Sequence, residues 1–306
     1  MIDNEGTQDN CDFADEEMMK AATYIKERQI FVAQSRGISL QGSQGDKGER
    51  CYTLTVDDNL FQPLSPPERE ELKRGDGCEL GHDHKPGKIQ AVHSSSALTC
   101  SIFSHWRLNG DVAAIARACR IPAPKAKSIE YEKKLPIMAN VDPKKFPKNP
   151  NIDVLISYES GSLKAVGIEC KFSEAYSGRR HSGLKPAYLN TVDLWGGIPA
   201  VLKLAEEICP DDNRFCHLHA AQLIKHILGL KHAYGKKGFR LLYLWYDVPF
   251  DEGQRHRQEI EEFASIVKAD GITFQHITYQ EVILKLIKDH WPEHSEYLKY
   301  IADRYL

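Results

Sequence analysis

The sequence predicts an α/β fold in which a mixed β-sheet is flanked by helices. Two observations lead to this prediction. The middle of the chain contains two short runs suited to a β-hairpin, and helical periodicity lies before and after them in the order helix, three strands, helix, strand. The near-continuous apolar run Phe239–Val248 adds a strand that is expected to be buried on both faces, as strands of parallel sheets are.

The expected elements follow one another closely from residue 94 onward. Ser94–Ser96 offer N-caps to a first helix, and Glu159–Ser162 is typical of a hairpin turn between two strands. The expected helices lie at 97–106, 111–118, 198–208, 215–234, 252–268 and 279–289, and the expected strands at 128–136, 152–158, 163–172, 239–248 and 273–278.

Length and composition indicate one enlarged globular domain. The chain has 306 residues, of which 42% are hydrophobic and 27% charged, values that are ordinary for a folded protein. Residues 1–48 combine an acidic start with a Gly/Ser/Gln-rich segment, so we expect an N-terminal extension and linker there, followed by a single domain at 49–306.

The sequence also limits where the protein acts and what it binds. No apolar run reaches the length that spans a bilayer, and the acidic start lacks the features of a signal peptide, so we expect a cytoplasmic protein without a membrane partner. The eight cysteines are irregularly spaced, which suits free thiols. A net charge of −3 argues against a protein that coats nucleic acid non-specifically, although a local basic groove remains compatible with it.

The predicted hairpin places three charged residues together. Side chains alternate along a strand, so Glu169 and Lys171 share one face while the residues between and beside them are apolar. Asp153 comes from the neighbouring strand. Burying carboxylates and an ammonium group together is costly unless they pair or hold a metal ion.

A divalent metal ion would resolve this conflict in a way that suits phosphodiester hydrolysis. Mg²⁺ prefers hard oxygen ligands, which Asp153 and Glu169 supply. The metal can polarise a phosphate and acidify a bound water, while Lys171 can orient that water or stabilise charge on the phosphate. The alternative is a plain Glu/Lys pair on the surface of an edge strand.

The same residues resemble a known family. Asp153 and the Glu169-x-Lys171 triplet are similar to the motif of the PD-(D/E)xK phosphodiesterase superfamily over residues 94–248, with Ile152 where the name-giving motif has Pro. More narrowly, segments 91–98, 131–132, 151–153 and 168–174 look like bacterial proteins described as restriction endonuclease-like nucleases. The resemblance implies a restriction endonuclease-like αβββαβ core and Mg²⁺-dependent cleavage, with Mn²⁺ as a substitute.

The resemblance suggests three further site residues. Many superfamily members add an upstream carboxylate, and Glu132 matches that role better than Glu130, although both would share a strand face. Glu174 follows the motif and could reach the metal or cap the chain there. Gln222 resembles a polar helix residue that steadies the site in some relatives, with a surface or capping role as the alternative.

Substrate contacts are expected from the Gly/Ser-rich loop after the motif strand. Arg179, Arg180, His181 and Lys185 lie in this loop, where basic side chains could meet phosphates, although solvated loop charge is equally compatible.

The sequence therefore predicts a DNA endonuclease of the restriction or defence type. The alternatives are a catalytically silent module that binds nucleic acid or protein on the same fold, and a nuclease that processes RNA or resolves junctions. Cleaving both strands of a duplex with one site per chain would suggest a symmetric homodimer.

Overall fold

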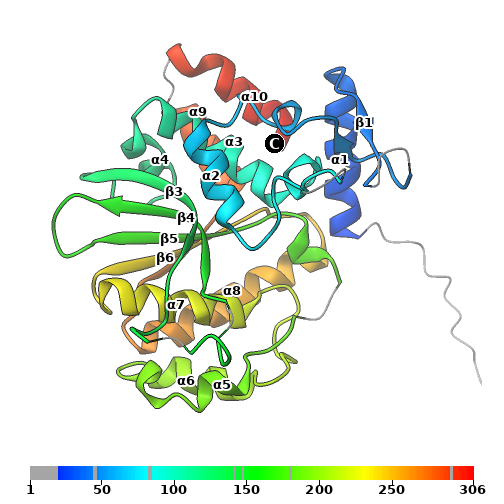
Figure 1. Ribbon diagram of the computed structural model, residues 1–306. Coiled ribbons are helices and arrows are strands. Elements are labelled where there is room, and N and C mark those ends of the chain that lie inside the picture. Colours follow the sequence, from blue (N-terminus) through cyan, green and yellow to red (C-terminus); the bar gives the residue numbers. More distant parts are fainter. Residues whose placement is uncertain are drawn as a thin grey trace, which may run out of the picture.

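The computed structural model describes residues 20–43, 47–81, 85–140, 142–146, 148–178, 181–289 and 292–306. Its centre is a five-stranded sheet (Figure 1). The strands are, in spatial order, β3 (Ala126–Lys134), β4 (Asn151–Tyr158), β5 (Ala165–Lys171), β6 (Phe239–Trp245) and β7 (Phe274–Thr278). The first three strands pair antiparallel, while β5, β6 and β7 pair parallel, so the sheet is mixed.

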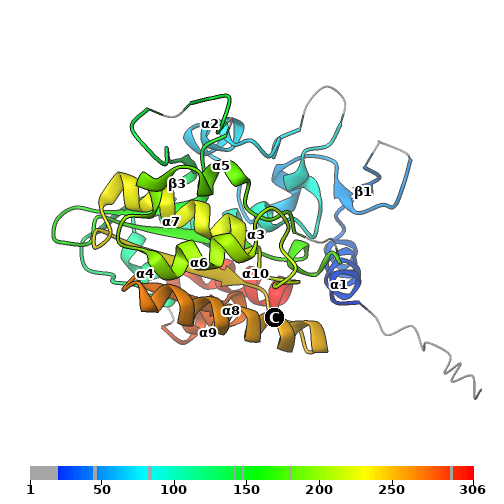
Figure 2. The ribbon, with the colours of Figure 1, turned by 90° about the horizontal axis from the view of Figure 1, so that it is seen from below.

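Helices cover both faces of the sheet, and the layers are seen from two directions in Figures 1 and 2. One face carries α1 (Ala21–Ser35), α2 (Pro66–Arg74), α3 (Ser95–Leu108), α4 (Val112–Ala118), α9 (Tyr279–Lys288) and α10 (Ser295–Tyr305). The other carries α5 (Pro186–Leu189), α6 (Pro199–Glu207), α7 (Ala220–Tyr234) and α8 (Asp251–Ala269). None of the described helices is long and apolar enough to cross a membrane.

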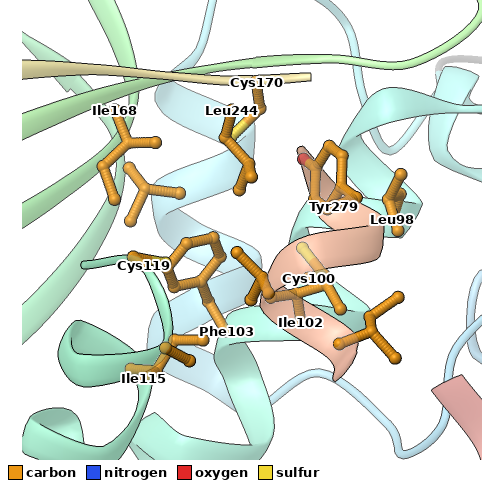
Figure 3. Packing of buried hydrophobic residues seen from close by; sticks show 14 of the residues in the cluster. Leu98, Cys100, Ile102, Phe103, Ile115, Cys119, Ile168, Cys170, Leu244 and Tyr279 are labelled. Atoms are coloured by element: carbon orange, nitrogen blue, oxygen red, sulfur yellow. The ribbon is translucent and has the colours of Figure 1, made fainter. Parts of the chain in front are cut away.

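Alternating side chains of the sheet feed two separate hydrophobic cores. Ile168 and Cys170 of β5 point into the first core, where they pack with Phe103 of α3 and Ile115 of α4 (Figure 3). The intervening residues of β5 face α7 and the second core. Glu169 and Lys171 therefore occupy the α7 side of the sheet.

The core order α3, β3, β4, β5, α7, β6 confirms the predicted αβββαβ arrangement. Ser94 caps α3 as expected, because its hydroxyl oxygen accepts a hydrogen bond from the Ala97 amide at 3.3 Å. Asp111 caps α4 in the same way. The expected fold class and the position of each sheet strand thus agree with the structure to within a few residues.

The helices after residue 94 differ from the expectation in two ways. The helix predicted to begin at residue 215 begins at Ala220, because the Glu259 carboxylate accepts the main-chain N–H groups of Cys216, His217 and Leu218 and holds them outside the helix. The short helix α5 and the C-terminal helix α10 were not predicted. The buried residues Tyr297, Leu298, Ile301 and Tyr305 of α10 recur at helical spacing and join the first core.

The described part of the N-terminal segment packs against this body. Ile25 of α1 is buried in the first core, and Gln29 exchanges hydrogen bonds with Arg304 at 3.0 and 3.1 Å. A short strand, β1 (Leu40–Gln41), pairs with β2 (Tyr52–Thr53), so part of the Gly/Ser/Gln-rich segment within residues 1–48 forms a strand. Residues 1–19 and 44–46 lie outside the described residues.

Candidate active site

Asp153 is fixed at the point where β4 and β5 stop pairing. The last described pair at this end of the ladder is Val154 with Ile168. One residue further along β4, a side chain replaces the main-chain partner: Asp153 Oδ2 accepts a hydrogen bond from the Cys170 amide at 2.7 Å. This contact holds the carboxylate of one strand directly beside the strand that carries Glu169 and Lys171.

Glu169 lies between two partners and is 1% exposed. The Lys171 ammonium donates to its Oε1 at 2.5 Å, and His226 Nε2 lies 2.6 Å from its Oε2. Burial raises the pKa of Glu169, but Lys171 and His226 outweigh burial and lower the pKa to about 2. Glu169 is therefore ionised at neutral pH.

Every fourth residue of helix α7 contacts every second residue of β5. Gln222 Oε1 accepts from Lys171 at 3.2 Å, His226 meets Glu169, and Leu230 packs where Gly167 has no side chain. A Cβ at Gly167 would lie 2.8 Å from Leu230 Cδ1. Four helical residues advance about 6 Å and two strand residues about 6.6 Å, so antiparallel α7 and β5 stay in step over three contacts.

The two other carboxylates have raised pKa values. Burial, followed by repulsion from Glu169, raises the pKa of Asp153 well above its ordinary value despite the opposing effect of Lys171. Burial and the nearby Glu79 raise the pKa of Glu132 to about 7, with a smaller contribution from Glu169. Burial and the neighbouring carboxylates thus disfavour the ionised forms of Asp153 and Glu132 in the metal-free protein.

Glu132, and not Glu130, lies beside this group. Glu132 falls between the strand pairs Tyr131–Val154 and Lys133–Ile152 and has a positive φ of 52°, which interrupts the regular alternation of β3. Its Oε2 accepts a hydrogen bond from Asn151. Glu130 instead pairs with Lys133 at 2.8 Å, so the two glutamates do not share the environment that regular alternation predicted.

The remaining sequence-predicted residues lie around the edge of the site. Glu174 Oε2 accepts from the Phe172 amide at 3.2 Å. Burial lowers the pKa of Lys171, but Glu169 and, next, Glu174 raise it. Lys185 lines a cavity next to Gln222. His181 stacks on His219 with ring centroids 4.7 Å apart. Arg179 and Arg180 lie outside the described residues.

The donor set fits a hard divalent cation, although the side chains are not gathered around one point. Asp153, Glu169 and Glu132 supply carboxylate oxygens, the ligands that Mg²⁺ prefers, and a bound cation would oppose the effect of burial that raises the pKa of two of them. Among the described residues, no three His, Cys, Asp or Glu side chains converge as a ready-made metal site. Both oxygens of Glu169 are engaged by Lys171 and His226.

His226 is the site residue that the sequence reasoning missed. It is 2% exposed and contacts Glu169 directly. The signal that could have found it is its spacing from Gln222, since residues four apart lie on the same face of a helix.

The mixed sheet, with acidic residues and a lysine where β4 and β5 separate, defines a protein with a restriction endonuclease-like α/β fold. A family model described as "Restriction Endonuclease associating with ARP" matches residues 25–306. The chain belongs to this family, and the match begins within α1 and extends to the last residue. No curated protein and no solved structure matches the chain.

Proposed function

We propose that the protein is a metal-dependent nuclease of the restriction or defence type that hydrolyses phosphodiester bonds in DNA. The observation that carries the proposal is the grouping of Asp153, Glu169 and Lys171 at one end of β5, held by the Cys170 amide and by α7. Membership of a restriction endonuclease family supports the same activity.

In this proposal Asp153 and Glu169 hold Mg²⁺, with Mn²⁺ as a substitute. The bound metal supplies polarisation of the phosphate and a more acidic water. The Lys171 ammonium stays charged, because its acidic neighbours outweigh burial and raise its pKa, and it stabilises the negative charge that grows on the phosphate oxygens. Gln222 keeps this ammonium in place.

Two glutamates support these residues. Glu132, with its pKa raised to about 7 by burial and by Glu79, is able to accept or release a proton near neutral pH. Glu174 holds the chain just after the motif through the Phe172 amide and adds negative charge next to Lys171.

The direct test is cleavage of supercoiled plasmid by the pure full-length chain in Mg²⁺ or Mn²⁺, with EDTA as the metal-free control. We expect nicked or linear product with metal and none in EDTA. The Asp153→Asn variant, prepared in the same way, excludes a contaminating nuclease if it leaves the plasmid intact. Intact plasmid with the parental protein across both metals and a range of pH would contradict the proposal.

The second candidate is a binding module without catalysis, and one observation favours it. Both oxygens of Glu169 are already engaged in the metal-free protein, so metal binding has to displace Lys171 or His226 from one of them or use the remaining lone pairs. Retained DNA binding without cleavage of plasmid, RNA or a four-way junction would select this candidate. Cleavage of RNA or the junction alone would instead identify the substrate.

The proposed partners follow from the proposed activity. DNA is the substrate, and a symmetric homodimer would place one site on each strand of a duplex. The family description names association with ARP, and we include such a partner in the proposal. Sedimentation of the protein with and without duplex DNA measures its oligomeric state and so tests the proposed homodimer.

A further inference from the structure

A cavity of about 580 Å³ lies directly beside the candidate active site. Its lining includes Gln222 and His226, the same α7 residues that hold Lys171 and Glu169. A cavity of this size can hold one small molecule or one nucleotide, but it cannot enclose a double helix. Whatever occupies it therefore lies next to the reacting centre.

Four lysines surround this cavity, which we call the lysine pocket: Lys145, Lys148, Lys185 and Lys225. Within the described parts of the chain, none of their ammonium groups forms an ion pair or a hydrogen bond. The one acidic side chain in the lining, Asp76, is engaged by Lys134 at 2.7 Å. The lysine pocket therefore carries uncompensated positive charge, although the whole chain has a net charge of −3.

Lys225 is the lysine of the pocket that lies next to His226 on α7, and burial acts against its charge. Burial lowers the pKa of its ammonium, the attraction of Glu169 opposes this, and the positive charge of Lys185 adds a smaller lowering. An anion placed between the two lysines would offset both effects. Phosphate groups are the anions that a nucleic-acid substrate would bring to this place.

Part of the lining of the pocket is apolar and held in place by the second core. The second core includes three of the lining residues, Leu184, Tyr188 and Phe146. The rings of Tyr188 and Phe146 meet edge to face with centroids 4.8 Å apart. The Leu184 amide donates to the Ile208 carbonyl at 3.1 Å, and a Cβ at Gly183 would lie 1.9 Å from that carbonyl oxygen. Glycine is thus required for this close approach, which fixes the wall before any ligand arrives.

We propose that the lysine pocket receives one unstacked nucleotide of the substrate strand, adjacent to the phosphate that is cut. Lys185 and Lys225 hold its phosphate, and its base lies in the apolar part of the lining. Lysines beside apolar side chains are the combination that a nucleotide, with an anionic and a flat apolar part, requires. The placement next to the scissile phosphate rests on the proposed nuclease function, whereas nucleotide binding itself does not.

The first experiment measures nucleotide binding without metal. The full-length protein in EDTA is titrated calorimetrically with thymidine 5′-monophosphate, inorganic phosphate and thymidine. We expect the nucleotide to bind more tightly than either part. The Lys185→Gln/Lys225→Gln variant should weaken nucleotide binding by about tenfold or more, because each lysine supplies a charge-assisted contact.

Two control variants separate loss of contact from loss of fold. Lys164→Gln removes an exposed lysine in the turn between β4 and β5, at the end of β5 opposite to Lys171. It should leave binding unchanged. Lys185→Arg/Lys225→Arg keeps both charges and should retain most of the affinity. Equal nucleotide affinity in the parental and Gln variants, or no binding of the nucleotide by the parental protein, overturns the proposal.

The second experiment uses DNA that already contains an unstacked base. Extruding a nucleotide costs less at a one-nucleotide bulge than in a matched duplex, so the parental protein in EDTA should bind the bulged duplex more tightly. The Gln variant should lose this preference. Equal affinity of the parental protein for both duplexes would sink the unstacked-nucleotide inference.

These results are separable from the test of catalysis. Plasmid cleavage with an unchanged KM in the Gln variant would reject the lysine pocket and leave the nuclease standing. Nucleotide binding that depends on Lys185 and Lys225, in a protein that never cuts, would reject the nuclease and leave the lysine pocket standing.

Discussion

His226 Nε2 lies 2.6 Å from Glu169 Oε2, and both side chains are almost completely buried. Lys171 binds the other oxygen of the same carboxylate at 2.5 Å. Glu169 is therefore kept ionised in an interior position by two nitrogen groups from different elements, β5 and α7. Its orientation depends on the position of α7 as much as on its own strand.

Replacing His226 with leucine should destabilise the metal-free protein. The change leaves one oxygen of a buried, ionised carboxylate without a partner, which typically costs about 3 kcal/mol. Urea denaturation of the two proteins measures the difference in the free energy of unfolding. His232→Leu, an exposed position on the same helix, is the matched control and should change little. Equal midpoints for His226→Leu and the parental protein would show that the contact contributes nothing to stability.

Neutralising Asp153 should remove activity and weaken metal binding together. Asp153→Asn keeps the side-chain shape, and its amide oxygen can still accept from the Cys170 amide, so the fold should persist. Calorimetric titration with Mg²⁺ or Mn²⁺ and plasmid cleavage should both report a loss, and Glu169→Gln should behave alike. Asp193→Asn, at an exposed position, should retain both properties. Parental cleavage by Asp153→Asn would remove this residue from the proposed site.

Lys171 should affect the rate without reducing metal affinity. Lys171→Ala should slow cleavage by a factor on the order of 10² or more, typical of losing one preorganised electrostatic partner. Metal affinity should stay the same or rise, because a neighbouring cation no longer repels the metal. Single-turnover rates at saturating Mg²⁺ and a metal titration of the same variant separate the two effects. A parental rate would reduce Lys171 to a structural partner of Glu169, and Lys164→Ala is the exposed control.

Glu132 should make the metal-free protein less stable as pH rises. Burial and Glu79 raise its pKa in the folded protein from 4.5 to about 7, so the folded state binds the proton more tightly than the unfolded state. The stability that this proton provides is complete below about pH 4.5 and is lost as pH rises through about 7. Glu132→Gln avoids the loss.

The measurement is the difference in melting temperature between Glu132→Gln and the parental protein in EDTA. The variant should melt higher at pH 8, and its advantage should shrink towards zero near pH 4. Glu130→Gln removes a glutamate of the same strand that pairs with Lys133, and it should not reproduce this pH dependence. A constant difference across the pH range would contradict the raised pKa of Glu132.

The sequence was sufficient for the parts of the site that neighbouring strands determine. Alternation along β5 puts Glu169 and Lys171 on one face, and a short hairpin brings Asp153 to them, so their proximity needs only local rules. His226 could not be placed in this way, because its contact with Glu169 depends on how α7 lies across the sheet after a connection of about fifty residues. The same dependence on tertiary contacts explains why Glu259 shifts the start of α7.

The contact between Gly167 and Leu230 has a consequence for how the sheet forms. If β5 paired one residue out of step, Val166 or Ile168 would occupy the place where a single Cβ already comes within 2.8 Å of Leu230. Glu169 and Lys171 would then turn towards the apolar core around Phe103, away from Gln222 and His226 (Figure 3). A shifted register of β5 would therefore be destabilised both by the steric clash and by burying two charged groups in an apolar core. Glu169 and Lys171, proposed for catalysis, thus also favour the correct strand register during folding.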